Sequence, residues 1–122
     1  MVLGIGSDII EVHRIEASIK NHGDRFLDRI FTEAEQNYCE KHRDAVRHYA
    51  GRFAAKEAIV KAFGTGISQS ISWLDIEVIN DEEGKPQVNF TPKVQHLFSN
   101  PQILLTISHC KEYAMAVALW VA

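Results

Sequence analysis

The sequence predicts an α+β fold, in which an N-terminal strand and several helices pack on a mainly antiparallel sheet. Apolar residues recur at helical spacing through most of the first half of the chain, whereas alternation of apolar and polar residues dominates the second half. No repeat, low-complexity tract or linker interrupts the 122 residues. A single domain over residues 1–122 is therefore expected.

The first half is expected to contain one strand and four helical segments. Residues 1–10 have strand character, with apolar side chains interrupted by two glycines. Thr32 followed by Glu35 has the spacing of a capping box, which marks the start of a helix. Within the longest segment Gly51 costs about 1 kcal/mol relative to alanine, which indicates close packing at that point. The helical segments are residues 11–21, residues 24–31, the stretch that follows residue 32, and residues 44–63.

The second half is expected to form a hairpin, a short helix and two further antiparallel strands. Leu74, Ile76 and Val78 alternate with acidic residues, as in a half-buried strand. Pro92 suits the first position of the helix, and His109 falls in the loop between the last two strands. The segments in chain order are residues 74–78 and 87–90 for the hairpin, 91–98 for the helix, and 103–107 and 115–121 for the last strands.

The composition argues against several classes of function. A net charge of -3 and a pI near 6.0 disfavour general nucleic-acid binding. No apolar run approaches the ~20 residues that span a bilayer, and the start lacks the features of a signal peptide, so no membrane association is expected. Cys39 and Cys110 are too few and too far apart for a disulfide framework or a zinc knuckle. A cytoplasmic location is therefore favoured, with Cys110 a buried or half-buried side chain rather than a nucleophile.

Asp8, Glu57 and Lys61 form the first candidate site. Asp8 is placed at the end of the first strand, where a carboxylate suits a cleft but also a simple turn or helix cap. Glu57 and Lys61 share one helical face, which a surface ion pair worth about 0.3–0.5 kcal/mol explains. With Asp8 they would instead make an oxygen site for Mg²⁺, beside which Lys61 neutralises phosphate. Taken alone, the helix favours the ion pair.

Two loops and a set of arginines carry weaker signals. The backbone amides around Gly64 and Gly66 are able to approach a phosphate, although a helix C-terminus and turn explain both glycines. His109 is able to act as a base or bind phosphate, but a lone loop histidine is more often a polar turn residue. The other five histidines show no metal spacing.

Arg14, Arg25 and Arg29 form a candidate basic strip for an acidic protein partner. Asp24 and Asp28 partly offset this charge, and a charge-mixed solvated face is the plainer interpretation. The composition gives little reason to reject that interpretation.

Three stretches in one order make these weak signals specific. They are GIGSDIIEVHRI near the start, AGRFAAKEAIVKAFGTGI in the middle and TISHCKEYAMAVAL near the end. Together with the GKP at residues 84–86, they resemble the holo-acyl-carrier-protein synthase family, the short 4′-phosphopantetheinyl transferases of bacterial type. The resemblance covers nearly the whole chain, and the central stretch is its specific motif.

The resemblance implies the 4′-phosphopantetheinyl transferase fold and a transfer of 4′-phosphopantetheine from coenzyme A to a serine of an apo acyl carrier protein. Adenosine 3′,5′-bisphosphate leaves. Asp8 and Glu57 match the residues that bind Mg²⁺ in the family, and Lys61 matches a phosphate contact. Glu57, Lys61 and His109 are the expected catalytic residues.

The resemblance also implies partners and an assembly. The arginines at positions 14, 25 and 29 match those that face the acidic helix of the carrier. The family forms homotrimers with active sites shared between neighbouring subunits. Positions expected to line the coenzyme A pocket are Arg52, Lys61, Gly64, Gly66, Pro86 and His109.

Some points stay open at this level. The serine proton is expected to pass to Glu57, directly or through water, with a metal-associated water or Glu35 as alternatives. Cys110 stands where many relatives have threonine or serine, and a thiol is the weaker hydrogen-bond partner. A Mg²⁺-dependent phosphoanhydride hydrolase and a non-catalytic coenzyme A-binding protein are the alternative functions. The sequence does not say whether the carrier serves fatty-acid synthesis or another pathway.

Overall fold

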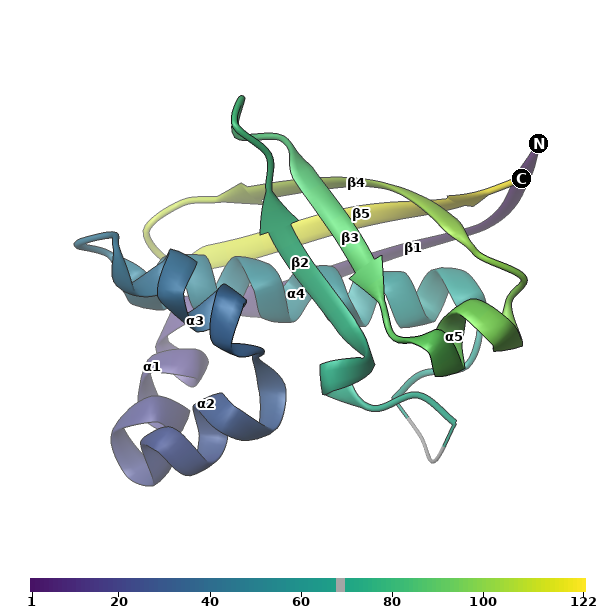
Figure 1. Ribbon diagram of the computed structural model, residues 1–122. Helices are drawn as coiled ribbons and strands as arrows, with labels where there is room; N and C mark the ends of the chain where they lie inside the picture. The colour runs from purple at the N-terminus through teal and green to yellow at the C-terminus, as the bar shows by residue number, and fades with distance from the viewer. Residues whose placement is uncertain (68–69) are drawn as a thin grey trace.

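The computed structural model describes residues 1–67 and 70–122 and confirms the α+β fold with antiparallel sheets (Figure 1). A three-stranded sheet has the strand order β1-β5-β4, and β2 pairs with β3 in a separate hairpin. The strands are β1 (Val2–Glu11), β2 (Ile76–Asn80), β3 (Pro86–Phe90), β4 (Gln102–His109) and β5 (Tyr113–Val121). The α-helices are α1 (Val12–His22), α2 (Asp24–Ile30), α3 (Glu33–Glu40), α4 (Ala45–Phe63) and α5 (Pro92–Leu97).

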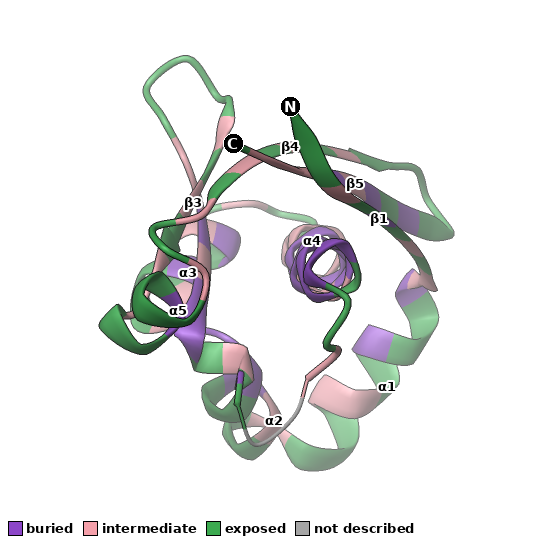
Figure 2. Cartoon of the chain, turned by 90° about the vertical axis from the view of Figure 1, so that its right-hand side faces the viewer, coloured by how far each residue is buried: buried purple, intermediate pink, exposed green. Residues whose placement is uncertain are grey.

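Helix α4 is the axis of the fold. Viewed along this helix, the sheet covers one side, while α1, α2 and the elements around β3 surround the others (Figure 2). Twelve of its 19 residues are buried, so other elements cover most of its surface, as a central helix requires. Gly64 ends it, as the sequence predicted, and adopts the left-handed conformation common at helix C-termini. Among the helices of the described residues, none is long and apolar enough to cross a membrane.

Small residues let the sheet approach α4 closely. A Cβ atom on Gly4 would lie 2.0 Å from the carbonyl oxygen of Ala62, and one on Gly6 would lie 2.0 Å from that of Ala58. Gly51 meets Ile107 of β4 in the same way, at 3.0 Å, which confirms the close packing predicted there. From β5, the alanines at 114, 116 and 118 face the helix and are buried. The two glycines of β1 therefore serve close packing, since neither has a positive φ angle.

The opposite face of the three-stranded sheet is apolar and exposed. Ile5 pairs with Leu119, which pairs in turn with Leu104 of β4, so these three side chains form one row across the sheet. Ile9 and Met115 form a parallel row. Ile5, Ile9 and Leu104 are each more than half exposed, at 67%, 66% and 55%. Monomeric proteins rarely expose contiguous apolar surface of this kind.

The hairpin and its flanking segments correct one detail of the prediction. Ile76 and Val78 are fully buried on β2, as alternation predicted, but Leu74 is exposed and lies in a short 3₁₀ turn, Trp73–Asp75. The turn starts here because the Ser72 backbone N–H donates to Asp75, in the same way as at the start of α3. There the capping box of Thr32 and Glu35 is present as predicted.

A buried ion pair joins the helical half to the hairpin half. Lys56 of α4 and Glu35 of α3 have fully buried side chains, with Nζ 2.7 Å from Oε1. The Lys56 ammonium also donates to the carbonyl oxygens of Ile30 and Trp73. Glu35 in turn accepts the Val78 N–H at 2.7 Å. Burial lowers the pKa of Lys56, and the Glu35 carboxylate opposes that shift.

Asp75 provides a test of this part of the fold by pH. Burial opposes its ionisation, but bonds from Lys93, Ser72 and Thr91 outweigh that effect and lower its pKa to about 2. A depressed pKa contributes stability that is present above the unfolded value of 3.8 and lost as the pH falls through about 2. We expect Asp75→Asn to lower the free energy of unfolding by about 2 kcal/mol at pH 6, with the difference shrinking towards pH 2. Urea unfolding of both proteins at several pH values measures it, and a pH-independent difference would contradict the assignment.

Candidate active site

The packing of β1 on α4 places Asp8 beside Glu57. Gly4 and Gly6 lie against Ala62 and Ala58, so each step of two residues along the strand moves back one turn along the helix. Asp8 is the next residue on that strand face, level with the preceding turn. It lies within β1, paired with Ala116, and not at the end of the strand as predicted.

Lys61 is the cation of this group. Its Nζ lies 3.0 Å from Oδ1 of Asp8 and donates to the Ser7 carbonyl oxygen at the same distance. The ion pair predicted from the helix alone was between Glu57 and Lys61, whereas the contact in the structure joins Lys61 to the neighbouring strand. The Asp8 side chain is 17% exposed and that of Lys61 51% exposed, so the pair is open to a ligand.

Glu57 is held in a setting that disfavours its charge. Partial burial raises its pKa, the nearby Asp8 carboxylate raises it further, and Lys61 only partly offsets both. A carboxylate with a raised pKa is a better proton acceptor near neutral pH than an ordinary one. Lys61 is the one cation beside two carboxyl groups, and its ion pair is with Asp8.

Asp8 and Glu57 open onto a cleft of about 490 Å³, here called the carboxylate cleft. Oxygen ligands at an open cleft suit Mg²⁺, which binds through one or two carboxylates and keeps sites for water and phosphate. Asp8 and Glu57 together carry more negative charge than Lys61 neutralises, and this excess fits the binding of a divalent cation. The residues that line the cleft are Asp8, Ile9, Ile10, Glu11, Arg14, Phe53, Glu57 and Tyr113.

Arg52 is the centre of a second cleft, of about 160 Å³, here called the arginine cleft. Its side chain is 3% exposed, lies 4.0 Å over the ring of Tyr38 and donates to Asn80. Its Nε has no hydrogen-bond partner among the described residues. A buried guanidinium with an unused donor is suited to an anion such as phosphate. Pro86 and His109 line the same cleft, together with Tyr38, His48, Gly51, Asn80, Gly84, Thr106 and Ile107.

The structure therefore brings together some of the predicted coenzyme A residues but not all of them. Arg52, Pro86 and His109 share the arginine cleft, which has no lining residue in common with the carboxylate cleft. Gly64 and Gly66 follow the far end of α4, and Gly64 comes twelve positions after Arg52, which corresponds to about 18 Å along the helix. One copy of the chain thus carries these groups at separate places.

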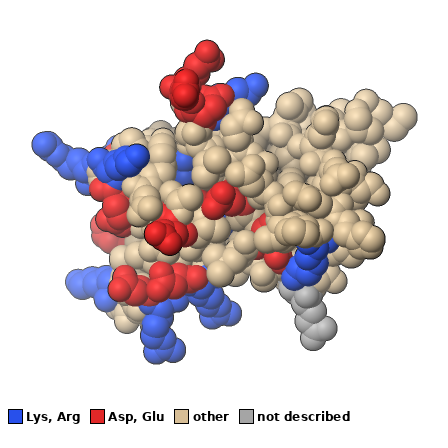
Figure 3. All heavy atoms as spheres, in the orientation of Figure 1, with Lys and Arg blue, Asp and Glu red and all other residues tan. Residues whose placement is uncertain are grey.

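The predicted basic strip is also divided. Arg14 lines the carboxylate cleft and pairs with Glu11 at 3.0 Å, whereas Arg25 and Arg29 line another hollow with His22 and Phe26. Basic and acidic side chains alternate on the surface where α1 and α2 lie, at the lower left of Figure 3. The surface is charge-mixed, as the plainer interpretation had it, with the two arginines of α2 on one hollow.

The positions of Glu35, Cys110 and His109 in the structure correct three further expectations. Glu35 is fully buried with both oxygens bonded, so it is not available to a substrate hydroxyl. Cys110 is exposed rather than buried or half-buried, because the β4–β5 turn projects into solvent. His109 is not a loop residue but the last residue of β4, paired with Ala114 of β5.

Sequence reasoning missed several residues that line the two clefts. Phe53 and Tyr113 flank the carboxylates, while Tyr38, His48 and Asn80 line the arginine cleft. His48 lies one turn before Arg52 and Phe53 lies one turn before Glu57, and both were usable signals, since residues four apart share a helical face. Nothing in the spacing points to the other three, which reach their clefts through tertiary packing.

Comparisons with known proteins agree over almost the entire chain. The family model of the 4′-phosphopantetheinyl transferase superfamily matches residues 4–118. The holo-[acyl-carrier-protein] synthase of Protochlamydia amoebophila is 58% identical over 120 residues, which cover 98% of each protein. The holo-(acyl-carrier-protein) synthase from Bacillus anthracis, crystallised in complex with CoA (3′,5′-ADP), is 43% identical with a TM-score of 0.84 and covers 98% of this chain and 96% of that one. The synthase structure from Neisseria meningitidis is 32% identical, with a TM-score of 0.91 over all of both chains.

Proposed function

Because the chain belongs to the 4′-phosphopantetheinyl transferase superfamily, as an enzyme of the holo-[acyl-carrier-protein] synthase type, we propose that it transfers 4′-phosphopantetheine from coenzyme A to a serine of an apo acyl carrier protein. The observation that carries the proposal is the grouping of Asp8, Glu57 and Lys61, in which the two carboxylates line an open cleft and Lys61 is bound to Asp8. The reaction needs a base and a cationic site for a pyrophosphate side by side.

Asp8, Glu57 and Lys61 each have a role in the proposed step. The serine oxygen attacks the phosphorus that carries pantetheine, and the bond from that phosphorus to the departing adenosine 3′,5′-bisphosphate breaks. Glu57 accepts the serine proton, directly or through a water, and Lys61 offsets the charge that develops on the phosphate oxygens. Asp8 and Glu57 would hold Mg²⁺, which when bound polarises and orients the pyrophosphate.

The arginine cleft is the proposed site for the phosphorylated adenosine end of coenzyme A. Arg52 offers the unused Nε–H, and His109 stands at the edge of the same cleft. Support also comes from the Bacillus anthracis relative, which was crystallised with CoA (3′,5′-ADP). Gly64 and Gly66 remain proposed contacts, from another end of the molecule.

We further propose that the active unit is a homotrimer with sites shared between subunits. The exposed apolar face of the β1-β5-β4 sheet, with Ile5, Ile9 and Leu104 at its surface, favours burial against further copies. Sharing would also join groups that one copy keeps apart, such as Arg52 and Gly66. Light scattering should give the mass of three chains, and a stable monomer at assay concentration would refute this part.

Measuring the release of adenosine 3′,5′-bisphosphate tests the function against its alternatives. The protein is incubated with coenzyme A and Mg²⁺, with and without an apo acyl carrier protein, and the nucleotide is followed by chromatography. Release that requires both carrier and Mg²⁺ is expected. Release without carrier would instead identify a phosphoanhydride hydrolase, and no release with a competent carrier would identify a coenzyme A-binding protein.

With two free cysteines in the chain, we place this reaction in the cytoplasm.

Carrier docking gives a separate prediction on α2. Arg25 and Arg29 are exposed on this short helix, and acidic carrier surfaces would steer towards them. We expect Arg29→Glu to raise KM for the carrier about tenfold or more, because it replaces an attractive charge with a repulsive one. KM for coenzyme A should stay unchanged. Arg43→Glu, on the turn before α4, is the matched control, and an equal effect of both changes would show that only net charge matters.

A further inference from the structure

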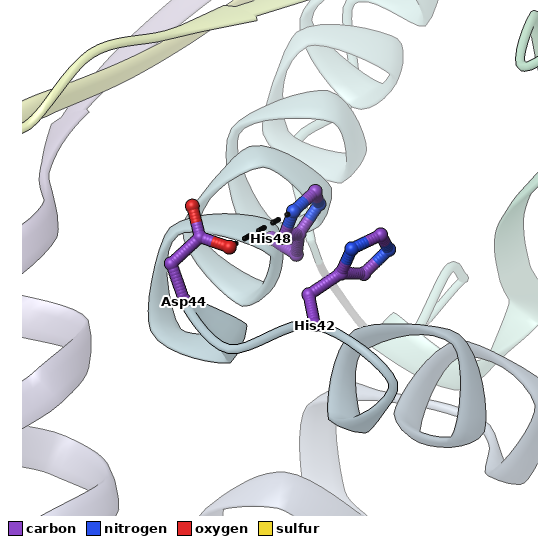
Figure 4. A group of neighbouring side chains, drawn as sticks. All are labelled: His42, Asp44 and His48. Atoms are coloured by element: carbon purple, nitrogen blue, oxygen red, sulfur yellow. Dashed lines mark ion pairs between the residues drawn. The ribbon is translucent and has the colours of Figure 1, made fainter.

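The turn between α3 and α4 brings together three side chains that lie outside the carboxylate cleft. His42 lies in the turn, Asp44 directly precedes α4, and His48 follows one helical turn later (Figure 4). Their ligand atoms, one from each side chain, all lie within 4.8 Å of one another. Nε2 of His48 is 3.5 Å from Oδ1 of Asp44, and the ring of His42 stacks on that of His48 with centroids 3.8 Å apart.

We propose that His42, Asp44 and His48 form a binding site for a divalent transition metal of the zinc class. Two imidazoles and one carboxylate are a ligand set that such metals favour, whereas Mg²⁺ prefers oxygen ligands alone. The site is thus chemically distinct from the carboxylate cleft. Three protein ligands leave a fourth position open for water or another small ligand.

The geometry requires a modest closure that these side chains are free to make. With metal–ligand bonds of about 2.0–2.1 Å, tetrahedral ligand atoms lie about 3.3 Å apart, so no pair of ligand atoms needs to approach by more than about 1.5 Å. The stacked imidazoles must also turn, because parallel rings cannot aim their lone pairs at one point. Asp44 is exposed and both histidines are only partly buried, which leaves room for rotation.

The positions on the chain favour chelation. Asp44 and His48 are four residues apart at the start of α4, the spacing that puts two side chains on one helical face. His42 reaches this face from the turn after α3. The centroid of its ring also lies 4.9 Å from that of Tyr38.

Binding of a metal at this site would change the shape of the arginine cleft. His48 lines that cleft, and its ring packs edge-on against His109 with centroids 5.2 Å apart. Turning His48 towards a metal therefore changes the cleft wall, and we expect weaker binding of adenosine 3′,5′-bisphosphate in the presence of Zn²⁺. This consequence rests on the proposed function, whereas the binding of metal does not.

Titration with Co²⁺, followed by its visible absorption, tests the site without an activity assay. The full chain carries Cys110→Ser, which removes the exposed thiol as a competing ligand, and millimolar Mg²⁺ occupies oxygen sites. One Co²⁺ per chain should bind, with the intense bands of a four- or five-coordinate ion. His42→Gln should weaken binding about tenfold or more, since even supporting residues of metal sites contribute that much.

His96→Gln is the matched control, because His96 is an exposed histidine on α5, a different element. Equal unfolding temperatures of both variants without metal would show that His42→Gln acts on binding alone. The proposal is overturned by binding that does not saturate near one Co²⁺ per chain. Equal affinity in His42→Gln and the parent protein would overturn it as well.

Discussion

Replacing Glu57 with glutamine is expected to reduce kcat/KM for the transfer by about a thousandfold or more. The amide cannot accept the serine proton, and it removes one of the two negative groups that would hold Mg²⁺. The fold should survive, because Glu57 is only partly buried and glutamine matches its shape. Initial rates of carrier modification under equal Mg²⁺ and coenzyme A concentrations measure the effect.

The control for this change is Glu33→Gln, an exposed glutamate in the first turn of α3. It should leave the rate within about twofold, since it lines neither cleft. A Glu57→Gln enzyme that keeps more than a tenth of the parent rate would remove Glu57 from the chemistry. In that case a metal-associated water is left as the base.

Replacing Lys56 with methionine is expected to cost about 3–5 kcal/mol of unfolding free energy. The change leaves the Glu35 carboxylate buried without its counter-ion and frees two carbonyl oxygens that Nζ now binds. Urea unfolding at one fixed protein concentration measures the loss, because assembly makes apparent stability depend on concentration.

Two further variants separate charge from packing at this pair. Adding Glu35→Gln to Lys56→Met removes the uncompensated charge, so the double variant should be less destabilised than the sum of the single changes. Lys20→Met, at an exposed position on α1, should change stability by no more than about 0.5 kcal/mol. Strict additivity of the two buried changes would mean that the ion pair is not coupled.

The sequence predicted the order of helices and strands because period and capping are local properties. The capping box at Thr32, the glycine after α4 and the hairpin of β2 and β3 each depend on a few neighbouring residues. The same local signals were wrong about the strand positions of Asp8 and His109. Strands β1 and β4 each extend further than the glycines and polar residues suggested, so both residues are paired within strands.

The burial of β5 shows why alternation alone is not enough. Met115, Val117 and Leu119 alternate with alanines along β5. Because the three larger side chains are the more apolar ones, the pattern alone predicts that they face the core. The structure turns the alanines inward because α4 lies too close to the sheet for larger side chains. That distance is set by the glycines of β1, more than 100 residues earlier, and no local pattern reports it.

The grouping of site residues was predictable only in part, for a related reason. Helical spacing puts Glu57 and Lys61 together, and the family resemblance added Asp8. Arg52 and Gly64 lie far apart because much of the length of α4 separates them. The burial of Glu35 depends on Lys56, 21 residues away, and the contact of His42 with His48 depends on the turn between two helices.

The intact mass of the carrier tests the central claim most directly. An apo acyl carrier protein is incubated with this protein, coenzyme A and Mg²⁺, then weighed and its modified peptide sequenced. The account predicts a gain of one phosphopantetheine on a single serine, absent with a chelator and absent with Glu57→Gln. A carrier of unchanged mass, with a known synthase modifying the same preparation, would contradict it.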